Sequence, residues 1–355
     1  MVPPGTHVGP ALAALAAACR ARYGRAVFAA DTTSLLELAP ERLIRLTPVR
    51  STESLQRVAE TDLSFDDLSA HGAPMLECLG TLNADLFVVG DAASLRLAGR
   101  IALLAIERAV PCRVIGLPAC PYNGVPFSLF NIGYGSALQW CAAIATSVRA
   151  SRLRDARRAP VGILHISGDH NGWLAAGAAA LAGTAHRPAF CITPGMAVKP
   201  EALARVVRKA VERDGTALVV MGDIVRDGAG KQLAPAGHSA AAVRQMLAAH
   251  ARLEAVATSI CPGDLLDAAH VSARDEQLAA RAARAAVRLC RTAPSSFMVA
   301  SRADGNRISF HATNLEDAQA ASRQLPPGHV SASSYQPAPA LRACLVECLL
   351  DARRW

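Results

Sequence analysis

Short runs rich in Val, Leu and Ile alternate with longer helical stretches along most of this chain of 355 residues. The runs expected to form strands are residues 25–31, 43–49, 84–90, 112–118, 161–168, 188–194, 216–223 and 254–261. The stretches expected to form helices are residues 10–22, 66–82, 94–109, 135–149, 173–183, 200–213, 239–252 and 272–291. This repeated order of strand, helix and strand predicts an α/β fold with mostly parallel sheets covered by helices on both faces.

The core of such sheets must be built mainly from Ala, Leu and Val, because 52% of the residues are hydrophobic and only 4% are aromatic. The ten cysteines are scattered without CxxC pairs, which favours free thiols in a reducing, cytoplasmic compartment. No apolar run reaches the roughly 18 to 20 residues that cross a bilayer, so no membrane association is expected. The N-terminal stretch reads as a helix rather than an export signal, because Arg20 and Arg22 follow it directly.

The formal net charge of +8 raises the question of a nucleic-acid partner. Three of the 37 basic residues are Lys and the rest are Arg, a bias that a GC-rich genome alone produces. The densest cluster, residues 149–158, follows a helical stretch and has no aromatic residues interleaved for base stacking. It is expected to be a solvated surface loop, and the expected partner is a small molecule rather than nucleic acid.

In parallel sheets, ligands bind at the carboxyl ends of the strands, so the residues after each run carry most information about function. Four such segments are rich in Gly and polar residues: VVGDAAS at 88–94, GLPACPYNG at 116–124, FNIGYGSALQ at 130–139 and ISGDHNGWLAAG at 166–177. A Gly-containing turn that leads into a helix can present backbone N–H groups to a phosphate. One such turn is a weak signal, and the order and spacing of all four make it specific.

In that order the segments resemble the 6-phosphofructokinase superfamily, and most of all its pyrophosphate-dependent branch. Residues 90–94 fall where that family has G-G-D-G/D-S, and residues 168–175 are similar to its M-G-R-x-A-G-W-L-A. Near the N-terminus, residues 4–7 look like its P-G-x-N. The resemblance implies two Rossmann-like three-layer lobes that face one cleft. It implies a donor-side lobe at 1–150, a substrate-side lobe at 151–290, a C-terminal segment at 291–355, and a homo-oligomer, either a dimer or a tetramer.

The resemblance also implies a set of site residues, with Mg²⁺ and ATP or pyrophosphate as cofactors if the protein is active. The donor-side candidates are Gly5, Gly90, Asp91 and Ser94, and the substrate-side candidates are Cys120, Asn123, Gly168 and Asp267. The candidates for catalysis are Tyr122, Asp169 and His170. Asp91 is also the candidate metal ligand, with a role as a helix cap as the alternative.

Several of these positions depart from the pattern of the family. Its metal-binding Asp falls on Ala92 and its base Asp on Tyr122, which is a poor base at neutral pH. Tyr122 either takes part in a new reaction or fills the space where substrate once sat. The substrate-contacting Arg residues become Asp169 and Asp267, and a Glu becomes Gly222, with Asp223 beside it. Carboxylates repel the phosphates that guanidinium groups attract.

His170 is open to two interpretations. Together with His165, Asp169 and Asp223, it lies at or near the ends of neighbouring strands, where a histidine beside carboxylates can be a general base or a metal ligand. The alternative is that His170 and Asn171 cap the helix that begins near Trp173.

Two classes of function remain open from the sequence. The first is a diverged enzyme with a re-made site, which is either a phosphotransferase for an acceptor other than fructose 6-phosphate or a catalyst of another small-molecule reaction. The second is a non-catalytic relative that binds a metabolite or a catalytic partner subunit. In both classes, ordinary 6-phosphofructokinase activity is not expected. The carboxylates that replace family arginines, Asp169 and Asp267, favour a neutral or cationic ligand.

Overall fold

The computed structural model describes residues 9–23, 27–29, 44–46, 65–235, 237–263, 271–293, 295–304, 307–316 and 322–349. Within these ranges every expected strand and helix is present, with ends that shift by a few residues. Two further strands and a helix, β9 (Phe297–Asp304), β10 (Arg307–Thr313) and α12 (Pro339–Leu349), were not expected. The chain divides into two compact units, residues 1–134 with 266–323 and residues 135–265 with 324–355.

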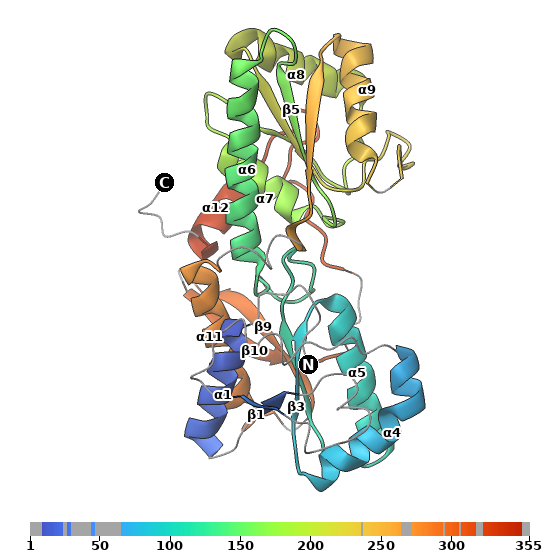
Figure 1. Ribbon diagram of the computed structural model, residues 1–355, viewed down its shortest axis with the longest axis vertical. Helices are drawn as coiled ribbons and strands as arrows, with labels where there is room; N and C mark the ends of the chain where they lie inside the picture. Colours follow the sequence, from blue (N-terminus) through green and yellow to red (C-terminus); the bar gives the residue numbers. More distant parts are fainter. Residues whose placement is uncertain are drawn as a thin grey trace. The chain divides into compact units, whose positions relative to one another are not determined.

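The first unit contains a four-stranded sheet with strand order β10-β9-β4-β3 (Figure 1). β3 (Leu86–Gly90) and β4 (Val114–Pro118) are parallel, and β9 runs parallel to β4. β10 pairs antiparallel to β9. β1 (Val27–Ala29) and β2 (Ile44–Leu46) form a separate antiparallel pair, so the expectation of parallel pairing is wrong for these two strands.

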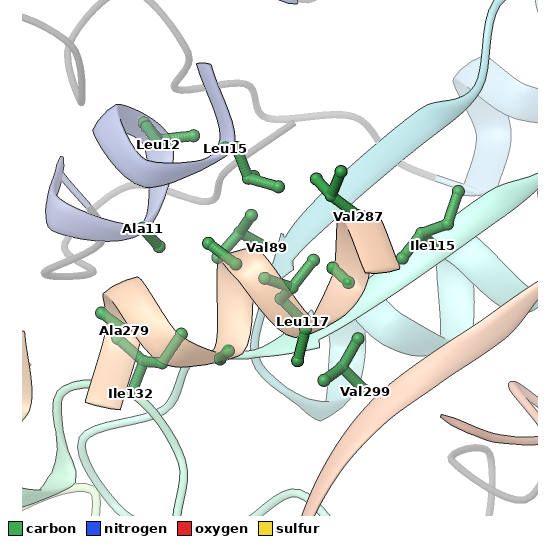
Figure 2. Close-up of a cluster of buried hydrophobic side chains, with 14 of the residues drawn as sticks. Ala11, Leu12, Leu15, Val89, Ile115, Leu117, Ile132, Ala279, Val287 and Val299 are labelled. Carbon is green, nitrogen blue, oxygen red and sulfur yellow. The ribbon is translucent and has the colours of Figure 1, made fainter. Parts of the chain in front are cut away.

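Helices cover both faces of this sheet because its strands carry apolar side chains on both faces. Val89, Ile115 and Leu117 project toward α1 (Gly9–Tyr23) and α11 (Ala273–Leu289), as Figure 2 shows. Val88 and Val114 project to the other face, where the core includes residues of α4 (Phe65–Thr81) and α5 (Ala92–Glu107). Successive strand side chains point to opposite faces, so a strand that is apolar throughout needs cover on both.

The second unit contains a fully parallel sheet with strand order β6-β7-β5-β8. Its strands are β5 (Val161–Ile166), β6 (Phe190–Ile192), β7 (Ala217–Met221) and β8 (Ala255–Ile260). Its helices are α6 (Tyr134–Arg154), α7 (Trp173–Ala182), α8 (Pro200–Asp214), α9 (Ser239–Ala251) and α12. α7 packs on β6, β7 and α12, while α8 and α9 pack together. β5, β6 and β7 are buried throughout, as strands covered on both faces must be.

The two compact units do not coincide with the expected ranges 1–150, 151–290 and 291–355. α6 belongs to the second unit, although most of it lies before residue 151, and α11 belongs to the first. The reason is that α11 packs against α1, β4 and β9, while β9 and β10 extend the sheet of the first unit. The chain therefore returns to the first unit after it has completed the sheet of the second.

The arginine cluster is only partly the solvated loop that was expected, because α6 continues to Arg154. Arg149 donates from its guanidinium to the carbonyl oxygens of Ala182, Arg187 and Pro188, at 3.1, 2.8 and 3.1 Å. This arginine therefore ties α6 to the segment after α7. Of the helices that the structure describes, none is long and apolar enough to span a bilayer.

Candidate functional site

At the end of β3, the side chain of Asp91 caps helix α5. Its Oδ1 accepts hydrogen bonds from the backbone N–H and the hydroxyl of Ser94, both at 2.9 Å. The capping role expected as one of two alternatives is therefore present. A carboxylate at this position also interacts favourably with the partial positive charge of the helix N-terminus.

Asp91→Ala is expected to lower the free energy of unfolding by about 1 kcal/mol, because it removes this cap without opening a core cavity. Chemical denaturation followed by circular dichroism measures the change. Asp91→Asn is the matched variant and should retain most of the stability, since its amide oxygen can still accept from Ser94. No loss in Asp91→Ala would show that the cap is unimportant, and equal losses in the two variants would show that the charge of Asp91 matters more than its hydrogen bonds.

The loop after β4 is held by two buried asparagines. Asn123 is fully buried with φ +56°, and its Oδ1 accepts from the N–H of Asn131 at 3.0 Å. Asn131 in turn accepts from the N–H of Val125 at 2.9 Å. Asn123, expected to bind substrate, thus organises the loop. Cys120 is also buried, and Tyr122 is half-buried against the core cluster that includes Leu95, as expected if it fills space.

Where the chain enters α6, the N–H of Gly133 donates to Asp275 Oδ1 at 3.1 Å. Asp275 is buried and comes from the first turn of α11, whose N-cap is Ser272. The contact joins the end of the β4 loop to α11 within the first unit. No sequence pattern pointed to this contact, because it joins residues 142 positions apart in the chain.

At the end of β5, Asp169 is completely buried and its carboxylate caps α7. Oδ1 accepts from the N–H of Gly172 at 2.9 Å, and Oδ2 accepts from the N–H of Ala175 at 2.8 Å. Gly172 has φ +83°, a left-handed conformation that glycine adopts without strain and that turns the chain into the helix. The expectation that Asp169 projects toward a ligand is wrong, because its own helix takes up its oxygens.

The expected cap of α7 is right for Asn171 and wrong for His170. Asn171 Oδ1 accepts from the N–H of Trp173 at 3.2 Å, whereas the imidazole of His170 is exposed. Its Nδ1 lies 3.8 Å from Asp223 Oδ2. Among residues 168–172, His170 is the one that solvent reaches most. It is therefore the candidate residue at this strand end that a dissolved ligand can contact.

Burial raises the pKa of Asp169 from 3.8 to about 6, although the N–H groups of Ala175, Gly172 and Asn171 and the charge of His170 act in the opposite direction. Desolvation disfavours the ionised carboxylate more than the helix amides favour it. Burial, and secondarily the charge of Asp169, also raises the pKa values of the thiols of Cys141 and Cys191 far above their usual range. These cysteines are inert core residues rather than nucleophiles.

Asp223 connects the ends of β5, β7 and β8. Its Oδ1 lies 2.7 Å from His165 Nε2, and its Oδ2 accepts from the N–H of Gly168 at 2.6 Å. The other ring nitrogen of His165, Nδ1, lies 3.1 Å from the hydroxyl of Ser259. The sequence indicated that His165 and Asp223 would be neighbours. Ser259 was missed, because only the register of β8 against β5 brings it opposite His165.

The fit of Mg²⁺ with ATP or pyrophosphate can be tested on the donor-side residues. Asp91 Oδ1 is already engaged by Ser94, and the residue next to it is Ala92. Within the described ranges, no three His, Cys, Asp or Glu side chains gather into a group that could hold a metal ion by itself. Mg²⁺ in a phosphate site is usually held by one or two carboxylates together with the phosphates. The donor side offers it a carboxylate that already caps α5, so these residues fit a metal-bound phosphate donor poorly. Gly5 and Asp267 lie outside the described residues.

The chain has two α/β units with mostly parallel sheets and with polar residues at the ends of their strands, as a phosphofructokinase-like fold requires. Residues 75–290, more than half of the chain, match the family described as Phosphofructokinase. The chain belongs to the phosphofructokinase family.

Two curated relatives are phosphofructokinases by name. The chain is 35% identical over 144 residues to a pyrophosphate–fructose 6-phosphate 1-phosphotransferase of Xanthomonas campestris, which is 39% of this chain and 34% of the relative. It is 28% identical over 216 residues to an ATP-dependent 6-phosphofructokinase of Amycolatopsis methanolica, which is 60% of this chain and 43% of the relative. The matched regions thus span less than half of either relative.

Solved structures extend the similarity of fold to nearly the whole chain. The pyrophosphate-dependent phosphofructokinase from Marinobacter aquaeolei superposes with a TM-score of 0.79 at 19% identity, over 97% of this chain and 88% of that one. The one from Nitrosospira multiformis gives 0.81 at 18% identity, over 97% and 89%. The expected fold is confirmed.

Proposed function

We propose that this chain is a diverged phosphofructokinase-family enzyme with a re-made site that does not phosphorylate fructose 6-phosphate. It acts on a neutral or cationic small molecule at its strand ends. The observation that carries the proposal is that the carboxylate of Asp169 accepts hydrogen bonds from the backbone N–H groups of Gly172 and Ala175 at the start of α7. By resemblance this position holds an arginine that contacts substrate in the family.

The chemistry at the start of α7 supports this choice of ligand. The N–H groups of a helix N-terminus attract phosphates, but here those of Gly172 and Ala175 already donate to Asp169. With a pKa of about 6, the carboxylate is mostly ionised at pH 7.5. A phosphate at this end of the helix would meet amides that are already used and a negative charge, whereas a neutral or cationic group would not be repelled. His170, exposed beside Asp223, is the side chain proposed to contact the ligand.

The second candidate function is a non-catalytic relative that binds a metabolite or a catalytic partner subunit. It is favoured by the structural roles of residues at the old catalytic positions. Asp91 and Asp169 cap helices, and Tyr122 packs against the core. Residues with such roles persist without any reaction to select them.

The test is a coupled assay of fructose 6-phosphate phosphorylation, with Mg²⁺ and either ATP or pyrophosphate, run beside a competent phosphofructokinase. Turnover is expected to be at least about 10³-fold below an ordinary value of about 10 s⁻¹, because the loss of a general base alone costs about 10² to 10⁴. Turnover near 10 s⁻¹ with either donor would refute the proposal.

A thermal-shift panel of sugar phosphates, neutral sugars, esters and amines then tests the proposed ligand class. Stabilisation by an uncharged or amine ligand, weakened in His170→Ala, supports this ligand class. Chemical conversion of that ligand then separates the enzyme from a non-catalytic binder. Glu107→Ala, which changes an exposed residue at the end of α5, is the control and should leave the shift unchanged. Stabilisation by fructose 6-phosphate alone would contradict the proposed ligand class.

A further inference from the structure

A serine, a histidine and an aspartate form one hydrogen-bonded chain at the carboxyl edge of the second sheet. His165 in β5 is paired in register with Ser259 in the neighbouring parallel strand β8. Side chains at paired positions of neighbouring strands project from the same face of a sheet. The hydroxyl of Ser259 therefore meets the imidazole, at 3.1 Å from Nδ1, while Asp223 lies 2.7 Å from Nε2.

The partners of Asp223 determine where the protons of this chain lie. An ionised carboxylate only accepts hydrogen bonds, and Asp223 Oδ2 already accepts from the N–H of Gly168. Asp223 Oδ1 then requires a proton on Nε2 of His165. In the neutral ring this leaves a lone pair on Nδ1, which can accept the hydroxyl proton of Ser259. The orientation is that of a base prepared to activate a serine.

The burial of the three groups also fits this role. The side chains of His165 and Asp223 are 1% and 5% exposed, whereas Ser259 is an exposed residue. The backbone oxygen of Asp223 accepts the hydroxyl of Ser239, which fixes the carboxylate-bearing residue from its other side. The base is thus held in place away from water, and the hydroxyl that it contacts is accessible from solution.

We propose that Ser259 is a nucleophile activated by His165 and Asp223, and that its substrates are uncharged carboxylic esters. The carboxylates of Asp223 and Asp169 both lie near this end of β5, so an uncharged ester is favoured over a phosphate ester. This inference does not depend on the proposed function, because the serine lies outside every motif that the family resemblance uses.

The reaction follows from the three groups. Ser259 Oγ attacks the carbonyl carbon of the ester while His165 Nδ1 takes the hydroxyl proton. The bond from carbon to the alcohol oxygen breaks, His165 returns the proton to the departing alkoxide, and the acyl group remains on Ser259. Water, deprotonated by His165, then attacks the acyl-serine and releases a carboxylic acid, after which the proton returns to Ser259. No oxidant, metal or further reactant is required.

A fluorophosphonate probe tests the nucleophile directly, with intact mass and peptide mapping as the readout. Wild type should gain one adduct, on Ser259, and Ser259→Ala should gain none there. Ser147→Ala, which removes an exposed hydroxyl that bonds to a carbonyl of its own helix, is the matched control and should react like wild type. His165→Gln should slow labelling by at least about 10²-fold, as expected for the loss of a general base.

The hydrolysis of 4-nitrophenyl acetate completes the test. Labelling of Ser259 in wild type can be measured whether or not His165→Gln folds. Ester hydrolysis should show a burst of one equivalent of nitrophenol, absent in Ser259→Ala. A folded wild type that is not labelled on Ser259, or an equal labelling rate in folded His165→Gln, would overturn the proposal. Ser259, His165 and Asp223 would then be only a structural link between strands.

Discussion

Asp169→Ala is expected to lower the free energy of unfolding by about 2 to 5 kcal/mol at pH 5. The change leaves the buried N–H groups of Gly172 and Ala175 without their acceptor, and each unsatisfied buried amide costs about 1 to 3 kcal/mol. A typical domain is stable by about 5 to 15 kcal/mol, so this one contact is a large share of the total. Urea denaturation followed by circular dichroism measures it.

The pH dependence of this loss has a definite sign. The folded-state pKa of about 6 lies above the ordinary 3.8, so the folded protein binds the proton of Asp169 more tightly than the unfolded chain does. The contribution of Asp169 to stability is therefore greatest at low pH and decreases as the pH rises through 6. Between pH 5 and 7.5 the destabilisation by Asp169→Ala should shrink by about 1 kcal/mol.

Asp155→Ala is the control, since it removes an exposed carboxylate after α6 and should change the free energy of unfolding by less than about 0.5 kcal/mol. A loss from Asp169→Ala that grows between pH 5 and 7.5 would show that the carboxylate is stabilised, rather than penalised, by its surroundings. A loss no larger than that of Asp155→Ala would show that α7 does not need its cap.

The elements of the sheets could be predicted from the sequence because their strands are nearly continuous apolar runs separated by helices. β5, for example, is buried at every residue, and such a run is distinct from its flanks. β9 and β10 were missed because polar and charged residues such as Arg302 and His311 interrupt them. Their place beside β4 depends on pairing over a long stretch of chain, which no local pattern encodes.

The candidate site could be predicted in position but not in orientation. Asp91 and Asp169 were both expected at strand ends, and both are there. Asp91 and Ser94 are three residues apart, which is the usual spacing of a capping contact, and the structure shows that contact. Asp169 does not follow this spacing alone, because it also accepts from the N–H of Ala175, six residues further on. The left-handed turn at Gly172 brings the two groups together. Whether a carboxylate turns to its own helix or to a ligand depends on such turns.

The close approach of β5 and β7 at their carboxyl ends explains why Gly222 is required. A Cβ at Gly222 would lie 2.4 Å from the backbone oxygen of Asp169, a separation that real Cβ atoms essentially never show. The same approach brings the N–H of Asp223 to that oxygen at 3.3 Å and lets Asp223 reach His165. The family resemblance places a Glu at this position. Such a side chain and the contact between Asp169 and Asp223 are mutually exclusive in this geometry.

Gly222→Ala is therefore expected to lower the free energy of unfolding by about 2 to 4 kcal/mol, since a buried backbone atom must move to admit the methyl group. Gly195→Ala is the matched control, because a Cβ there has no atom within 4 Å, and it should stay within about 0.5 kcal/mol of wild type. Denaturation of the two variants side by side measures the difference. If Gly222→Ala is as stable as Gly195→Ala, the ends of β5 and β7 can separate to admit a side chain. The steric argument that a glutamate at position 222 excludes the contact between Asp169 and Asp223 would then fail.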